Sequence, residues 1–198
     1  MFNIFSQNQQ RILIVDENRL QSSDMQLATF AAGCFWCIQE FLSTLNGVQN
    51  TIAGYTGGSV PNPTYAQVCN GTSGYVEAVQ FKYDPAIISY DTLLNVFFDM
   101  HDPTQWDRQG NDVGPQYRSI IFYHDDKQKH LAERKIFELG VNYKNPIVTQ
   151  LKPAVKLYPA EPIHQFYFRG HKSEPYCSVT IVKKLMFLRN KYKHLLKI

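Results

Sequence analysis

The chain has 198 residues, of which 44% are hydrophobic and 19% are charged, and its formal net charge is +3 at pH 7. This length is enough for one domain with a sizeable core, and the composition is that of an ordinary globular protein. So small a charge excludes nucleic acid as an expected partner, and no apolar run reaches the ~18 residues of a membrane span. Four cysteines are too few for a disulfide-dense secreted scaffold. We therefore expect a reducing, cytoplasmic setting in which thiols are available for chemistry.

The first part of the chain predicts an extension followed by the start of a domain. Residues 1–24 hold Gln- and Asn-rich pieces around one short apolar run, so we expect the domain to cover residues 25–198. Residues 25–32 predict a strand, which Gly33 ends. From Cys34 onward apolar residues recur at helical spacing, and Gly47 stands where a glycine cap ends a helix.

The rest of the chain alternates strands and helices. We expect, in chain order, a strand over residues 48–58, a loop over 59–68, a strand over 74–85, a helix over 89–102 with Ser89 as its N-cap, a strand over 118–124 and a helix over 125–140. Strand–helix–strand–strand–helix–strand is the order of a ferredoxin-like split βαβ core, an α+β fold. The Pro-rich remainder predicts a long irregular C-terminal wrap, with residues 183–194 as a solvated helix face.

The segment GCFWC places two cysteines where the first strand, the glycine turn and the first helix meet. Free backbone N–H groups and the positive end of the helix dipole favour a thiolate there, so Cys34 is the candidate nucleophile. The alternative is a buried structural cysteine, since free cysteine is among the most buried residue types. Cys37 is close enough for a disulfide with Cys34 if the first helical turn adjusts, and it suits the core equally well.

Glu77 is the candidate acid. The period of two in the strand puts Glu77 on one face with Val79 and Phe81, where a carboxyl is out of place unless it is paired or protonated. Burial without a cation raises the pKa of a carboxyl, as a general acid near neutrality requires. An edge-strand glutamate that reaches solvent, or one paired with an arginine, is the alternative.

Three further polar residues lie in shaped loops. Asp112 and Tyr117 belong to the segment 108–119, whose glycines and proline lead directly into a strand. Such loops often carry sites, although an asparagine–aspartate turn is usually only turn chemistry. Tyr65 is more typical of a packed surface aromatic than of a ligand group.

Nine motifs together resemble one family. They are, in chain order, GCFWC, GYTGG, NPTY, SGYVEAV, HDPTQ, RQGNDVGPQYRS, YPAE, HQ and PYCSV. The chain resembles the A-type peptide methionine sulfoxide reductases from about Thr29 to Val182, and residues 1–24 lie outside the resemblance. The family reverses methionine oxidation, so the resemblance implies reduction of methionine S-sulfoxide, free or in oxidised proteins.

The resemblance also implies a role for each candidate residue. The thiolate of Cys34 attacks the sulfur, Phe35 and Trp36 house the methyl group, Glu77 protonates the oxygen, Tyr65 and Tyr117 bind that oxygen, and Asp112 supports the pocket. The attack leaves a sulfenic acid on Cys34, a second thiol condenses with it to a disulfide, and thioredoxin reduces the disulfide. We expect no metal and no other cofactor, no nucleic acid or membrane partner, and a monomer.

The sequence leaves open which of two cysteines forms the disulfide with Cys34. Cys177 follows the Gly170 hinge in a stretch expected to be mobile, and it matches the resolving cysteine of many relatives. Cys37 stands where many relatives have glycine, and a helix constrains its side chain. We therefore favour Cys177 over Cys37, and expect Cys69 to be a structural bystander.

The sequence departs from the family pattern at three other positions. Pro162 and Ile163 replace an acidic and an aromatic residue beside the substrate rim, and Pro115 replaces a common threonine before Tyr117.

Two other functions are compatible with paired cysteines. A thioredoxin-like oxidoreductase also uses C-x-x-C at a helix start, but its tryptophan precedes the first cysteine, whereas Trp36 lies between the two. A zinc-binding module would need a second pair, and Cys69 and Cys177 are single and far apart.

Overall fold

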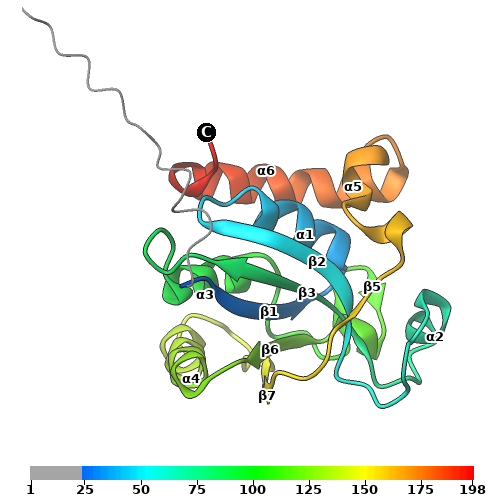
Figure 1. Ribbon diagram of the computed structural model, residues 1–198, viewed down its shortest axis with the longest axis horizontal. Helices are drawn as coiled ribbons and strands as arrows, with labels where there is room; N and C mark the ends of the chain where they lie inside the picture. The colour runs from blue at the N-terminus through cyan, green and yellow to red at the C-terminus, as the bar shows by residue number, and fades with distance from the viewer. Residues whose placement is uncertain (1–23) are drawn as a thin grey trace, which may run out of the picture.

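The structure is a computed structural model that describes residues 24–198, so the expected extension lies outside the described residues except for Asp24. Its centre is a six-stranded sheet with the order β7-β6-β1-β3-β2-β8 (Figure 1). The strands are β1 (Gln26–Ala32), β2 (Val48–Thr56), β3 (Val76–Tyr83), β6 (Ser119–Tyr123), β7 (Gln150–Pro153) and β8 (Tyr158–Pro159). A separate pair is formed by β4 (Arg108–Gln109) and β5 (Asp112–Val113).

Six α-helices accompany the strands within residues 24–198. They are α1 (Phe35–Ser43), α2 (Tyr65–Cys69), α3 (Tyr90–Asp99), α4 (Asp126–Gly140), α5 (Tyr167–Gly170) and α6 (Val182–Lys191). The predicted N-cap of α3 is confirmed, because the side chain of Ser89 accepts a hydrogen bond from the amide of Thr92. None of these helices combines the length and the apolarity that crossing a membrane requires.

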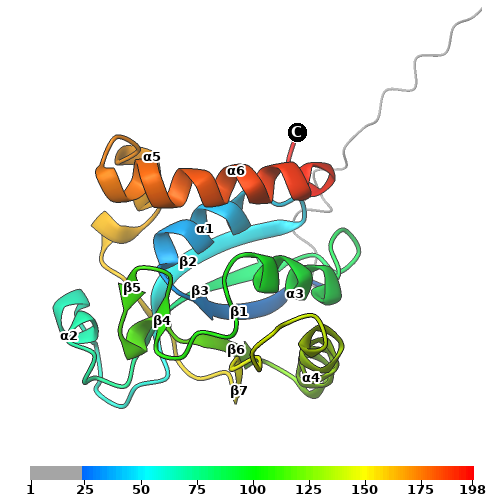
Figure 2. The same ribbon diagram turned by 180° about the vertical axis from the view of Figure 1, so that it is seen from behind.

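The four inner strands have the order β6-β1-β3-β2 with antiparallel neighbours, which confirms the ferredoxin-like α+β core. Both α1 and α3 lie on one face of this sheet, which Figure 2 shows from the helix side. The main core forms there, and its largest buried side chains include Phe30, Phe81 and Phe97. On the opposite face a smaller apolar cluster is covered by Ala154 and Leu157 of the C-terminal segment.

The prediction of a loop over residues 59–68 is wrong for its last residues, because α2 begins at Tyr65. Thr64 and Gln67 form a reciprocal capping box, in which each side chain binds the backbone N–H of the other residue. This local signal satisfies two free amides and starts a helix that is too short to show a hydrophobic period.

The C-terminal wrap crosses the sheet and ends in regular structure. The chain adds β7 beside β6, passes to the other edge of the sheet as β8, and returns over α1 as α5 and α6 (Figure 1). A π-helical turn, Cys177–Ile181, leads directly into α6, so this stretch is helical rather than an irregular loop. The buried carboxylate of Glu40 on α1 holds both helices through Arg169 and Arg189.

Candidate active site

Gly33 makes the turn that puts Cys34 at the start of α1, as predicted. Its φ of +87° is open to glycine but strained for other residues, and an added Cβ would lie 2.7 Å from the side chain of Gln109. The backbone therefore passes from β1 into α1 within two residues, and Cys34 is the N-cap of the helix.

Glu77 reaches the same point from β3. Its side chain is only 2% exposed, and one oxygen accepts a hydrogen bond of 3.0 Å from the amide of Phe35. Burial raises the pKa of this carboxyl to about 8, and Asp112 adds to the rise, while the Phe35 amide lowers the pKa. Glu77 is thus protonated at neutral pH and can donate a proton beside Cys34.

Cys34 itself differs from the prediction. Burial and the nearby Glu77 raise the pKa of the thiol well above its usual value, although hydrogen bonds with the Tyr176 hydroxyl and the Trp36 amide lower it. The N–H groups at the helix start are shared between Glu77 and Cys34, so they do not outweigh desolvation. Desolvation therefore outweighs the helix start, and the pKa of Cys34 is raised, contrary to the prediction that the helix start favours a thiolate.

An aromatic cluster covers the first turn of α1. The indole of Trp36 stacks on Tyr167 with ring centres 3.8 Å apart, and its ring lies 5.9 Å from that of His164. His164 also stacks on Tyr65 at 4.2 Å. Phe35 is fully buried beneath this cluster. The sequence reasoning missed His164 and Tyr167, whose only signal was their place in the motif HQ and just after it.

The two phenols, which come from α2 and from a 3-10 turn, both lie close enough to Glu77 for its charge to affect their pKa values. The amide of Tyr65 donates to Glu161 at 2.8 Å, which fixes the first residue of α2, and Tyr117 ends the 3-10 turn Pro115–Tyr117. Burial raises the pKa of each phenol above its usual value, helped by Cys69 and then Glu77 at Tyr65 and by Glu77 at Tyr117. Both hydroxyl groups are therefore proton-bearing donors at neutral pH.

Asp112 joins the site through a residue that the sequence reasoning missed. Its carboxylate accepts a hydrogen bond of 2.7 Å from the hydroxyl of Tyr176, which also forms a hydrogen bond with Cys34. Tyr176 precedes Cys177 in the motif PYCSV, so the motif contained it but assigned it no role. Pro115 and Pro162 each occupy the first turn of a 3-10 helix, where the missing N–H costs nothing.

The two candidate resolving cysteines lie in different surroundings. Cys37 lines a cavity of about 290 Å³ together with Cys34, Asp112 and Tyr176. Cys177 is 0% exposed in the π-helical turn and does not line that cavity. Cys69 forms a hydrogen bond with the hydroxyl of Tyr65.

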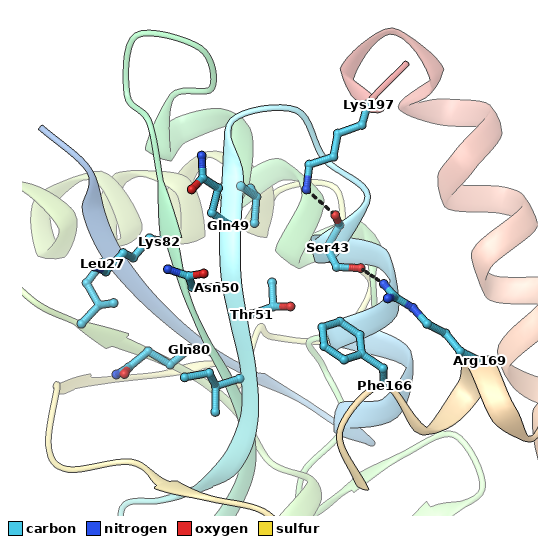
Figure 3. A pocket seen from close by; sticks show the side chains of 12 residues that line it. Leu27, Ser43, Gln49, Asn50, Thr51, Gln80, Lys82, Phe166, Arg169 and Lys197 are labelled. Carbon is cyan, nitrogen blue, oxygen red and sulfur yellow. Dashed lines mark hydrogen bonds between the residues drawn. The ribbon is translucent and has the colours of Figure 1, made fainter. Parts of the chain in front are cut away.

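A cavity of about 760 Å³ lies elsewhere, around the first half of β2 (Figure 3). On its rim Arg169 and Lys197 both donate to Ser43, to its hydroxyl and to its carbonyl oxygen respectively. Among residues 24–198 no cysteine, aspartate or glutamate lines this cavity, so it offers no thiol and no carboxyl. The chemistry therefore lies at the start of α1.

Comparison with known proteins gives one consistent family. The model of the family "Peptide methionine sulfoxide reductase" matches residues 26–196. The peptide methionine sulfoxide reductase MsrA of a Thermus thermophilus strain is 49% identical over 172 residues, which cover 87% of this chain and 98% of the relative. The crystal structure of reduced Mxr1 from Saccharomyces cerevisiae aligns with a TM-score of 0.71 at 30% identity, over 78% of this chain and 90% of that one.

A second structure of yeast Mxr1, in complex with Trx2, aligns with a TM-score of 0.52 at 24% identity, over 74% of this chain and 86% of that one. At that identity the likeness concerns the fold alone.

Proposed function

The chain belongs to the peptide methionine sulfoxide reductases, and we propose on that premise that it reduces the S epimer of methionine sulfoxide, free and in oxidised proteins. The observation that carries the proposal is the juxtaposition of a thiol and a protonated carboxyl. Cys34 caps α1, and the amide of the next residue binds Glu77, whose pKa is raised to about 8. A sulfoxide needs both groups, because its sulfur accepts a nucleophile and its oxygen must be protonated.

The first half-reaction uses these groups together. The Cys34 sulfur supplies an electron pair to the sulfoxide sulfur, while Glu77 protonates the oxygen and regains a proton from the Cys34 thiol. A bond forms between the Cys34 sulfur and the sulfoxide sulfur, the S–O bond breaks, and the protonated oxygen leaves as hydroxide. Hydroxide then attacks the Cys34 sulfur, the sulfur–sulfur bond breaks, methionine leaves, and Cys34 is left as a sulfenic acid. Tyr65 and Tyr117 bind the oxygen, Phe35 and Trp36 hold the methyl group, and Asp112 fixes the site through Tyr176.

Epimer selectivity follows from this division of the pocket. The donors to the oxygen and the aromatic pair lie on different sides of a chiral sulfur, so the R epimer reaches the donors only with its methyl group displaced. Pockets built around hydrogen bonds discriminate by about 10⁴-fold. Methionine release from the two separated epimers measures the selectivity, and comparable rates would contradict this pocket.

For the second thiol we propose Cys37, in contrast to the preference for Cys177 drawn from the sequence. Cys37 and Cys34 line one cavity, whereas Cys177 is fully buried outside it. The Cys37 thiol condenses with the sulfenic acid, which forms the Cys34–Cys37 disulfide and releases water. A disulfide requires the Cβ atoms to come within about 3.5–4.5 Å, which two cysteines three residues apart in the first helical turn reach when that turn adjusts.

The cycle closes when a dithiol protein of the thioredoxin class reduces the disulfide, as the complex of yeast Mxr1 with Trx2 leads us to propose. We place the protein in the cytoplasm, because the four cysteines are free and a reducing compartment keeps them so.

We also propose that the protein works as a monomer, since one chain contributes every residue of the site. Residues 25–198 form the catalytic domain in this proposal.

One experiment tests these assignments together. Each variant is given one equivalent of methionine S-sulfoxide without reductant, and mass spectrometry follows methionine, sulfenic acid and disulfide. Cys34→Ser releases no methionine, because a serine hydroxyl is barely ionised at pH 7. Cys37→Ser completes one turnover and retains a sulfenic acid that dimedone traps, whereas Cys177→Ser forms the Cys34–Cys37 disulfide. Activity in Cys34→Ser would overturn the function, and a stalled Cys177→Ser would overturn only the choice of Cys37.

A further inference from the structure

Cys34 is bordered by two separate surroundings. The substrate groups Tyr65, Glu77 and Tyr117 do not line the 290 Å³ cavity described above. That cavity is lined instead by Cys34 and Cys37 from α1, Asp112 from β5, Tyr176, and Lys183 and Lys184 from α6. Both cysteines therefore face a space that Asp112 and Tyr176 border but that the three groups which bind or protonate the oxygen do not line, and two cations border it.

Of the two lysines that line this cavity, Lys184 is the one whose charge affects the other groups lining it. Its charge lowers the pKa of Cys37 and of Asp112, against the burial that raises both. Among the charged neighbours of Cys37 it has the largest effect, ahead of Asp112 and Glu40, which both raise the pKa. Within residues 24–198 no carboxylate forms an ion pair with Lys184, so its charge is not neutralised by direct contact.

We propose that this cavity is the entrance for the reducing protein, and that Lys184 assists regeneration by stabilising the Cys37 thiolate as it leaves. The inference rests on the proposed function, and specifically on a disulfide between Cys34 and Cys37. A thiolate of the reductant attacks the sulfur of Cys34, the bond between Cys34 and Cys37 breaks, and Cys37 departs as a thiolate. The second thiol of the reductant then attacks the mixed disulfide, which frees Cys34 and leaves the reductant oxidised.

The surface beside the cavity suits a protein rather than a small thiol. Met186 and Phe187 are 61% and 54% exposed, and they follow Lys183 by three and four residues on α6, so the three side chains are neighbours on one helical face. A cavity of about 290 Å³ accepts one or two side chains of a protruding cysteine segment. Met186 and Phe187 then contact the apolar surface around that segment, which is the occupant that we assign to this face.

The test separates the two half-reactions. Lys184→Gln is compared with Lys184→Arg and with Lys193→Gln, a matched loss of one lysine in the 3-10 turn Lys193–Leu195 beyond the end of α6. We expect Lys184→Gln to release methionine in a single turnover at the wild-type rate. Reduction of its preformed disulfide slows by about three- to tenfold with thioredoxin and with dithiothreitol, because the rate depends on the pKa of the leaving thiol. Lys184→Arg restores the rate, and Lys193→Gln leaves it unchanged.

Phe187→Ser tests the docking surface. It slows reduction by thioredoxin at least threefold and leaves reduction by dithiothreitol unchanged. A wild-type regeneration rate in Lys184→Gln would overturn the role of Lys184, and an unchanged thioredoxin rate in Phe187→Ser would overturn the docking face. A disulfide found between Cys34 and Cys177 would overturn the inference while leaving the reductase activity intact, and absence of methionine release from the wild type would instead overturn the proposed function.

Discussion

Glu77 is a carboxyl that is buried with no cation paired to it among residues 24–198. Ionising such a group in an apolar environment is costly, and the single amide of Phe35 compensates only part of that cost. The carboxyl therefore keeps its proton at neutral pH. This is an unfavourable way to stabilise a strand and a suitable way to hold an acid beside a thiol.

We expect Glu77→Gln to slow the single-turnover release of methionine by about 100-fold or more, which is the scale of general acid catalysis. Glutamine keeps the size of the side chain and a hydrogen-bond donor but cannot transfer a proton. The measurement is quenched-flow detection of methionine from methionine S-sulfoxide. An unchanged rate would mean that the carboxyl has only a structural role.

The pH dependence of the same step has a defined sign. The competent form carries the Glu77 proton, and the pKa of Glu77 is raised to about 8. The single-turnover rate is therefore constant below this value and falls tenfold for each pH unit above it, as the acid ionises. Glu77→Gln removes this descending limb. A wild-type rate that rises steadily from pH 7 to pH 10 would contradict the assignment.

At the scale of elements, the junction of β1 and α1 determines where the nucleophile lies. The turn at Gly33 has a left-handed backbone and packs against Gln109 of β4, whose neighbouring strand β5 carries Asp112. One glycine thus sets the positions of both Cys34 and the hairpin that supports it. The helix supplies amides to two acceptors, which explains why its start holds Glu77 as well as Cys34.

Gly33→Ala tests this junction. The positive φ costs a non-glycine residue about 1–3 kcal/mol, and the added methyl group would overlap the Gln109 side chain. We expect a loss of about that size in the free energy of unfolding, measured by urea denaturation, and a lower single-turnover rate. Gly140→Ala at the end of α4 is the control, because an added Cβ there meets nothing within 4 Å. Equal stabilities of the two variants would show that the turn is not constrained.

At the scale of the whole molecule, the C-terminal segment completes the site that the ferredoxin-like core begins. It contributes His164, Tyr167 and Tyr176, which cover Trp36, and Lys184, which borders the cysteines. Glu40 attaches this segment to α1, with ion pairs of 2.9 Å to Arg169 and 3.3 Å to Arg189.

Glu40→Gln weakens this attachment. Its carboxylate is buried and serves two arginines that are themselves half exposed, so we expect a loss of about 1 kcal/mol in the free energy of unfolding. Glu133→Gln is the control, since its ion pair with Lys129 is exposed and 3.9 Å long and contributes less than about 0.5 kcal/mol. Urea denaturation of both variants measures the difference. Equal losses would mean that the C-terminal helices are held by apolar packing alone.

The amino-acid sequence by itself determined the order of strands and helices in the core, the cap at Ser89 and the turn at Gly33. These depend on hydrophobic period, on side chains that bind nearby amides, and on backbone freedom, all of which act over a few residues. It also indicated Glu77, because a carboxyl on an apolar strand face is a local anomaly. The short helix α2 was not predicted, because its sequence has a capping signal but is too short for a hydrophobic period.

Only the tertiary structure decided in which direction the pKa of Cys34 is shifted and what surrounds the two cysteines that could pair with it. The pKa of a thiol depends on desolvation and on charges that come from other elements, here Glu77 on β3 and Asp112 on β5. In the same way, Tyr176 and Lys184 reach the start of α1 only because the C-terminal segment returns across the sheet. No spacing in the sequence records that return, since it is set by the packing of α5 and α6 on α1.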